Sequence, residues 1–208
     1  MARPVSASST SAGLSSASEA HFSADGLQRL WLIRRWAPGN RTLLFIGLNP
    51  SRADQQRDDP TLRRLVGFGR SWGYDALVVV NLFARISPSP AVLLRCADPI
   101  GPEADAALLM WSARWARTEA WDLWCGWGNG GCRWQRDCQV RGLLAPLLSS
   151  RSRGFPWAAG PLSLGCTKGG HPRHPLYASK ESTLQPFAWA GSAPIRHPEV
   201  ISKHRRSR

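Results

Sequence analysis

Asn49, Pro50 and Ser51 come two residues after a continuous apolar segment, residues 43–46, and this stretch of the chain is the most informative about its chemistry. An apolar run closed by Gly47 and an Asn-Pro step is typical of a buried parallel strand that stops abruptly. In open α/β sheets, ligands bind just beyond the carboxyl ends of such strands. The Asn49 amide, held extended by Pro50, could orient a substrate or a water there, although Asn-Pro-Ser also suits a simple turn.

Two further polar segments follow other apolar runs of the chain. Asn81 and Phe83 come after residues 76–80, and a loop at 167–177 comes after residues 161–166. Because the carboxyl ends of parallel strands share one edge of a sheet, we expect these segments to meet the Asn-Pro-Ser segment there. The sequence therefore predicts one site built from several strand ends.

Each residue type in these segments suits the binding of a nucleobase or a phosphate. An Asn amide offers one acceptor and two donors to the edge of a base, and an aromatic ring such as Phe83 can stack on a base. Basic side chains can contact phosphate or a developing anion, and glycine lets backbone N–H groups approach closely. The expected members from the last loop are Thr167, Lys168, Gly170, Arg173, His174 and Tyr177. The alternatives are a capping role for Asn81, a core position for Phe83 and a surface position for His174.

The elements that must position these segments alternate along the chain. Asp59 is a suitable N-cap, Pro60 suits the first turn of a helix, and Gly73 suits its end. We expect strands at 42–48, 76–80, 121–127 and 161–166, helices at 60–72, 90–95, 102–117 and 135–148, and a short helix or strand at 26–36. Strands that alternate with helices predict a parallel sheet covered on both faces.

Length and charge limit the organisation and the partners of the chain. It has 208 residues, is 43% hydrophobic, and carries a net charge of +13 from 27 Lys and Arg against 14 Asp and Glu. We predict a disordered Ser- and Ala-rich segment at 1–21, a single α/β domain at 22–190, and a basic, disordered tail at 191–208. The basic excess favours nucleic acid or a nucleotide as the partner, with a general enrichment in Arg as the alternative.

Other residue types argue against disulfide bonds, a metal site and a membrane span. The odd number of cysteines, five, argues against a disulfide framework, so we expect buried free thiols. Asp54, Asp58, Asp59 and Asp98 could hold Mg²⁺, but Asp59 and Asp98 each precede Pro and suit caps or turns, and we predict neither a metal nor a cofactor. Trp111 and Trp115 are four residues apart and suit the core face of a helix.

No apolar stretch has the length of a membrane span, so we expect a cytoplasmic protein, and no protein partner is indicated.

Several short motifs follow one another between residues 30 and 187. They are Asn49-Pro50-Ser51, Asp58-Asp59-Pro60-Thr61, Trp72-Gly73-Tyr74, Asn81-Leu82-Phe83-Ala84, Asp98-Pro99, Trp127-Gly128, and a long segment from Leu164 to Tyr177. This order resembles a bacterial family that is catalogued as domain of unknown function 1643. The resemblance implies no particular activity.

A more distant resemblance implies a chemistry. Gly47-Leu48-Asn49-Pro50 is similar to the Gly-Ile-Asn-Pro motif of the mismatch-specific branch of the uracil-DNA glycosylase superfamily. It implies that Asn49 positions the hydrolytic water, that Asn81 reads the edge of the base, and that His174, followed by Pro175, supports the leaving base. It also implies a three-layer α/β/α sandwich with a central, mostly parallel four-stranded sheet.

The chain departs from that superfamily at Ser51, where the branch has Gly, at Leu176-Tyr177, and in having no Asp at the first motif to act as general base. Two functions therefore stay open. One is a glycosylase-like hydrolase acting on a nucleobase in nucleic acid or in a nucleotide. The other is a non-catalytic nucleic-acid or nucleotide-binding module on the same scaffold. In the first, the catalytic residues are Asn49 and His174, and the binding residues are Pro50, Ser51, Asn81, Phe83, Thr167, Lys168, Gly170, Arg173 and Tyr177. A metal-dependent phosphodiesterase using Asp54, Asp58 and Asp59 is a third, weaker alternative.

Overall fold

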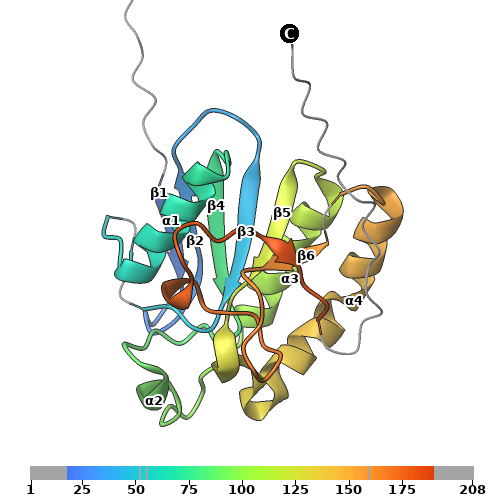
Figure 1. The fold of residues 1–208 in the computed structure, drawn as a ribbon. Coiled ribbons are helices and arrows are strands. Elements are labelled where there is room, and N and C mark those ends of the chain that lie inside the picture. Colours follow the sequence, from blue (N-terminus) through green and yellow to red (C-terminus); the bar gives the residue numbers. More distant parts are fainter. Residues whose placement is uncertain (1–17, 52, 55, 159, 190–208) are drawn as a thin grey trace, which may run out of the picture.

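One seven-stranded sheet organises the chain in the computed structural model, which describes residues 18–51, 53, 54, 56–158 and 160–189 (Figure 1). The strands are β1 (Ser18–Phe22), β2 (Arg29–Arg35), β3 (Thr42–Gly47), β4 (Ala76–Asn81), β5 (Trp121–Cys125), β6 (Pro161–Ser163) and β7 (Gln185–Pro186). The α-helices are α1 (Pro60–Ser71), α2 (Pro90–Leu93), α3 (Ala104–Arg117) and α4 (Arg136–Gly154). Two 3₁₀ helices, η1 (Gly128–Gln135) and η2 (Pro175–Tyr177), follow β5 and β6.

The middle of the sheet is parallel and its edges are antiparallel. The strands lie in the order β1-β2-β4-β3-β5-β6-β7, and β4, β3, β5 and β6 pair in parallel. These are the four expected strands. The pairs β1·β2, β2·β4 and β6·β7 are antiparallel. The prediction of a four-stranded, mostly parallel sheet is therefore too small, and the fold is mixed α/β with a partly parallel sheet.

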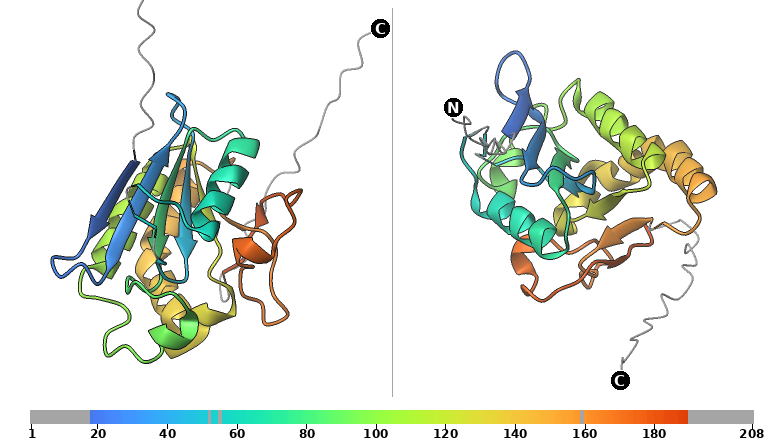
Figure 2. Two further views of the ribbon diagram at one scale, coloured as in Figure 1. Left: turned by 90° about the vertical axis from the view of Figure 1, so that its left-hand side faces the viewer. Right: turned by 90° about the horizontal axis from the view of Figure 1, so that it is seen from above.

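Helices cover both faces of the sheet because the central strands are apolar on both sides. Every residue of β3 and β4 is buried, and alternate residues point to opposite faces. On one face, Leu44 and Val80 share a cluster with Trp111 and Trp115 of α3, which lie in the core as predicted. On the other face, Phe45 packs in a cluster with residues of α1. Figure 2 shows α1 on one side of the sheet and α3 with α4 on the other.

Helix α1 begins and ends as the sequence predicts. The Asp59 carboxylate accepts a hydrogen bond of 2.7 Å from the Leu62 N–H, and Pro60 occupies the first turn. Just after the helix, Gly73 has a φ of +76°, a left-handed conformation that glycine adopts without strain. The cap holds the start of α1 next to the carboxyl end of β3, where Asn49 lies.

The start of the fold lies earlier than predicted. Strand β1 begins at Ser18, inside the segment expected to be disordered, and pairs with β2, so that Ser18 faces Arg34. The ring of His21 stacks on Trp31 at 5.4 Å between centroids. Composition did not indicate this strand because it lies at the edge of the sheet and its side chains are exposed or half-buried. The rest of that segment, residues 1–17, and the predicted tail at 191–208 lie outside the described residues.

The cysteines are free thiols, but most of them are not buried. Cys125 in β5 is buried, whereas Cys132, Cys138 and Cys166 are exposed and Cys96 is half-buried. The expectation of buried thiols is wrong for these four, because they lie on loops and helix surfaces beyond the core. Within the described part of the chain, no helix has both the length and the apolar character that crossing a membrane requires.

Candidate functional site

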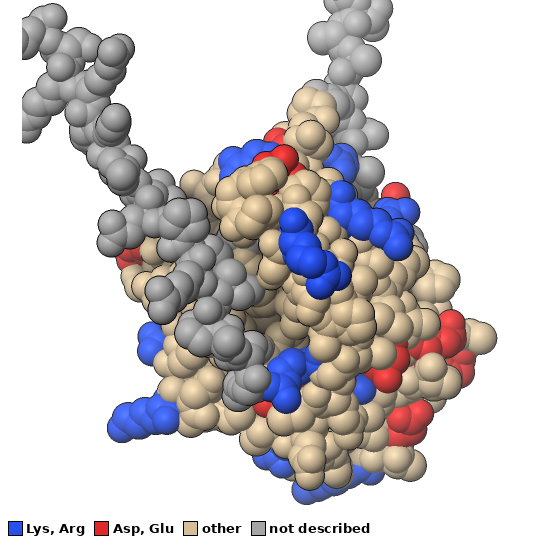
Figure 3. All heavy atoms as spheres, turned by 90° about the vertical axis from the view of Figure 1, so that its right-hand side faces the viewer, with Lys and Arg blue, Asp and Glu red and all other residues tan. Residues whose placement is uncertain are grey.

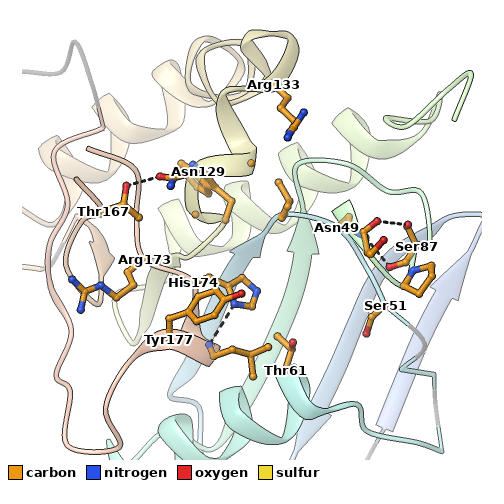
Figure 4. A pocket seen from close by; sticks show the side chains of 17 residues that line it. Asn49, Ser51, Thr61, Ser87, Asn129, Arg133, Thr167, Arg173, His174 and Tyr177 are labelled. Atoms are coloured by element: carbon orange, nitrogen blue, oxygen red, sulfur yellow. Dashed lines mark hydrogen bonds between the residues drawn. The ribbon is translucent and has the colours of Figure 1, made fainter. Parts of the chain in front are cut away.

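A cavity of about 790 Å³, here called the large cavity, opens beyond the carboxyl ends of β3, β5 and β6 (Figure 4). Its described lining residues come from the segments that follow these strands, from the start of α1 and from the loop before α2. They are Leu48, Asn49, Ser51, Thr61, Ser87, Pro88, Ser89, Trp127, Gly128, Asn129, Gly130, Arg133, Thr167, Arg173, His174, Leu176 and Tyr177. The cavity therefore lies where α/β sheets place their ligands.

A second cavity of about 50 Å³, here called the small cavity, lies beside the large one. Both are lined by Leu48, Asn49, Ser51, Thr61 and His174. The small cavity is also lined by Asn81 from the end of β4, by Arg29 from the start of β2 and by Asp59 from the cap of α1. The structure thus brings Asn49, Asn81 and His174 together around one small space.

Asn49 both builds its own turn and borders the cavities. Its Nδ2 donates to the carbonyl oxygens of Pro50 at 2.9 Å and Ser87 at 3.1 Å, and the Ser87 N–H donates back to the Pro50 carbonyl. These bonds join the loop after β3 to the loop before α2, as Figure 4 shows. They also fix the amide orientation, so that its Oδ1 stays available to accept from a ligand or a water. The turn and the site are therefore compatible interpretations of this residue.

Asn81 is a buried polar side chain with an unused donor. Only 6% of its surface is exposed, and its Nδ2 has no hydrogen-bond partner among the described residues. A buried amide group that lacks a partner costs about 1–3 kcal/mol of stability. At the wall of a cavity, such a donor is available to a ligand or to a water.

Gly47 provides the space that Asn81 occupies, which leads to a first prediction. A Cβ at position 47 would lie 2.8 Å from the Asn81 Oδ1 and 2.8 Å from the Phe45 ring. We expect Gly47→Ala to displace Asn81 and to lower the free energy of unfolding by about 1–3 kcal/mol through overpacking. Denaturant titration measures that loss. Gly67→Ala in α1 is the matched control, because a Cβ there meets nothing within 4 Å. An unchanged stability of Gly47→Ala would contradict the tight contact.

His174 presents a hydrogen-bond donor to the cavities. Its Nδ1 accepts from the Leu176 N–H at 3.3 Å, so the neutral ring carries its proton on Nε2. Burial lowers the pKa of His174 below its ordinary value of 6.5, and the nearby Asp59 carboxylate opposes that shift only in part. The imidazole is therefore neutral at neutral pH.

Arg29 and Asp59 add two charges to the small cavity. The buried Arg29 donates from Nη1 to the Ala53 carbonyl at 2.8 Å. Burial lowers the pKa of Arg29 to about 10, and the Asp59 charge partly offsets this, so the guanidinium stays protonated at neutral pH. Asp59 uses one carboxylate oxygen for the cap of α1 and accepts on the other from the Ser51 hydroxyl. One cation and one anion thus face the same space.

A family model described as "Protein of unknown function (DUF1643)" matches residues 29–176. The chain belongs to this family. No curated protein and no solved structure matches it. The matched range contains every described residue that lines the small cavity and all of those that line the large cavity except Tyr177.

In this family member, some predicted site residues lie away from both cavities. Phe83 is fully buried in the core, edge-on to Trp134 at 5.5 Å between centroids. Pro50 is buried beneath the Asn49 turn, and Lys168 and Gly170 are exposed on the last loop. Of the other predicted residues, Asn81 lines the small cavity, Thr167, Arg173 and Tyr177 line the large one, and Asn49, Ser51 and His174 line both.

The structure also adds residues that the sequence interpretation did not include. The segment after β5 contributes Asn129, whose Oδ1 accepts from the Thr167 hydroxyl at 2.6 Å and so joins the loops after β5 and β6. It also contributes Arg133. The strand-end rule could have found this segment, because Gly128-Asn129-Gly130-Gly131 closes the third predicted strand. Thr61, Ser87 and Ser89 come from a helix start and a loop, and no sequence pattern indicated them.

The four carboxylates considered for a metal have separate partners. Asp54 accepts from the N–H groups of Gln56 and Arg57, and Asp58 pairs with Arg34 at 2.8 Å. Asp59 caps α1, and Asp98 accepts from the N–H groups of Ile100 and Gly101. Across the described residues, no group of three or more His, Cys, Asp or Glu side chains is placed to hold a metal ion.

The charge of the large cavity is basic. Arg133 and Arg173 line it, and none of its described lining residues is an Asp or a Glu. On the face shown in Figure 3, Lys and Arg side chains are spread across the surface, and acidic side chains lie mainly at the right-hand side, with others beside basic ones at the top. Such a cavity favours a ligand that carries negative charge.

Proposed function

We propose that the chain binds a nucleobase-bearing ligand in the large cavity and hydrolyses its N-glycosidic bond, in the manner of a uracil-DNA glycosylase. The observation that carries this proposal is the convergence of Asn49, Asn81 and His174 on one small cavity. The large cavity beside it has the size of a typical small-molecule site, about 300–1,000 Å³.

The free hydrogen-bonding atoms suit a base that leaves as an anion. The Asn81 Nδ2 and the His174 Nε2–H are donors that suit the carbonyl oxygens of a pyrimidine or an oxidised purine. A neutral imidazole that donates to such an oxygen stabilises the negative charge that develops as the bond to the sugar breaks. The Asn49 Oδ1 would accept from the attacking water. Asn49, Asn81 and His174 therefore have complementary tasks.

The basic side chains favour a ligand with phosphate. Arg133 and Arg173 line the large cavity without an opposing carboxylate among the described residues, and Tyr177 is 81% exposed at its border. A base in a nucleic acid would have to leave the stack to reach the cavity, and backbone phosphates would then lie near its mouth. Nucleic acid or a nucleotide is thus the ligand class that the charge supports.

Oligonucleotides with a single altered base test the proposal. We expect the full chain to release at least one of uracil, hypoxanthine or an alkylated base from single- or double-stranded DNA, seen as alkali-labile abasic sites. In the Arg133→Gln/Arg173→Gln variant, binding should weaken. The slope of log K against log salt should fall by about 2, since each phosphate contact contributes about 1.

The outcomes separate the two functions. Salt-sensitive binding without release of any base would support the non-catalytic module instead. Neither release nor binding of any of these oligonucleotides would contradict both functions as they apply to nucleic acid. An unchanged salt slope in the double-arginine variant would remove the phosphate contacts from the proposal.

A further inference from the structure

We propose that the small cavity holds the attacking water and that Asp59 accepts a proton from it, an inference that rests on the proposed function. Asp59 would then be the general base of the reaction. The superfamily resemblance offers no carboxylate at the first motif, and Asp59 reaches the site from a different element, the cap of α1.

The small cavity has the size and the polar lining that a bound water needs. Its volume of about 50 Å³ exceeds the roughly 10–15 Å³ that one water requires, and is far below that of the large cavity. A buried water needs two to four polar partners. The unpaired Nε of Arg29 and the side chains of Asn49 and Asp59 are available at its wall.

Asp59 retains acceptor capacity after its structural contacts are counted. An ionised carboxylate has about four lone-pair positions. One is used by the Leu62 N–H and one by the Ser51 hydroxyl, a bond that holds the carboxylate toward the loop after β3. Two positions therefore remain, and the buried Arg29 cation in the same cavity is a counter-charge for the ionised form.

The arrangement supports a balanced hydrolytic step. The water oxygen bonds to the anomeric carbon of the sugar, and one of its protons passes to the Asp59 carboxylate. The bond between that carbon and the base nitrogen breaks, and its electron pair stays on the base, whose oxygen accepts from the His174 Nε2–H. Asp59 then returns the proton to solvent and the base anion takes one up. The net change adds the elements of water across the N-glycosidic bond.

Asp59→Asn tests the inference without removing the helix cap, because Asn is as good an N-cap as Asp. We expect the single-turnover rate on a uracil-containing oligonucleotide to fall roughly 10²–10⁴-fold, the usual contribution of a general base. The Kd for the same oligonucleotide and the Tm should stay close to those of the wild type. Asp59→Ser, which also caps well, should show the same loss of rate.

Asp54→Asn is the matched control. It removes the same charge from the same segment, keeps an acceptor for the Gln56 and Arg57 N–H groups, and lies outside both cavities, so its rate should equal that of the wild type.

The possible failures are distinguishable. In one outcome, the wild type releases a base while the rate of Asp59→Asn stays within about threefold of the wild-type rate. In that case the inference fails and the proposed function stands, because the loss of a general base would lower the rate far more than about threefold. If both Asp59 variants lose binding and Tm together with the rate, Asp59 is a structural residue and the inference fails. If the wild type releases no base from any oligonucleotide, the inference and the hydrolytic function fail together.

Discussion

Asn81→Ala should weaken binding of a uracil-containing oligonucleotide by roughly 5–150-fold while leaving the fold almost as stable as the wild type. The affinity loss corresponds to the 1–3 kcal/mol that a buried, hydrogen-bonded polar group contributes. The stability should change little, because the Nδ2 of Asn81 has no partner among the described residues. Removing an unpaired buried amide relieves a cost of about 1–3 kcal/mol, which offsets the van der Waals packing that the shorter side chain no longer provides.

Fluorescence anisotropy and denaturant titration measure the two effects in parallel. Ser112→Ala in α3 is the matched control, because its buried hydroxyl also has no partner among the described residues but lies outside both cavities. It should retain the wild-type affinity. A large loss of stability in Asn81→Ala with unchanged affinity would make Asn81 a structural residue and would remove it from the site.

The sequence predicts the centre of the fold better than its edges for a physical reason. Strands β3 and β4 are buried on both faces, so they appear as continuous apolar runs that no other element matches as well. Strand β2 alternates buried and half-buried positions and begins with Arg29. Its sequence therefore suits a helix as well as a strand. Strands β1 and β7 are the edge strands of the sheet, and their side chains are exposed or half-buried, so they form no apolar pattern that the sequence could show.

The site was predictable to the same extent as the strands that form it. Asn49, Asn81 and His174 follow expected strands, so the strand-end rule placed them at one edge. Arg29 reaches the small cavity from an antiparallel strand that sequence patterns left ambiguous. Asp59 already had a sufficient explanation as a helix cap, and that explanation concealed its second carboxylate oxygen. A residue with two tasks is hard to recognise from spacing alone.

Arg151→Met should lower the free energy of unfolding by at least about 3 kcal/mol, the largest stability effect that we expect. Arg151 is 1% exposed, and its guanidinium donates to the carbonyl oxygens of Trp115, Thr118, Glu119 and Trp121 at 2.7–3.1 Å. A hydrogen bond from a charged group contributes about 1.5–3 kcal/mol, and the variant loses all four of these bonds, although the carbonyls of Trp115 and Thr118 keep a backbone N–H partner. The cation also faces the C-terminal end of α3, where the helix dipole is negative.

These four hydrogen-bonded carbonyls hold the turn between α3 and β5, the strand that leads to Trp127 and Gly128 at the large cavity. Arg151→Lys should fall between the wild type and Arg151→Met, because one ammonium group cannot reach four carbonyls that a planar guanidinium can.

Arg153→Met is the control for the charge change, since Arg153 is exposed on the same helix and should alter stability by no more than about 0.5 kcal/mol. Urea titrations of the three variants show whether the loss of stability comes from the hydrogen bonds to the turn between α3 and β5 or from the loss of a positive charge. If Arg151→Met were as stable as Arg153→Met, the four hydrogen bonds of the guanidinium would contribute nothing measurable, and α4 would not determine how β5 enters the sheet.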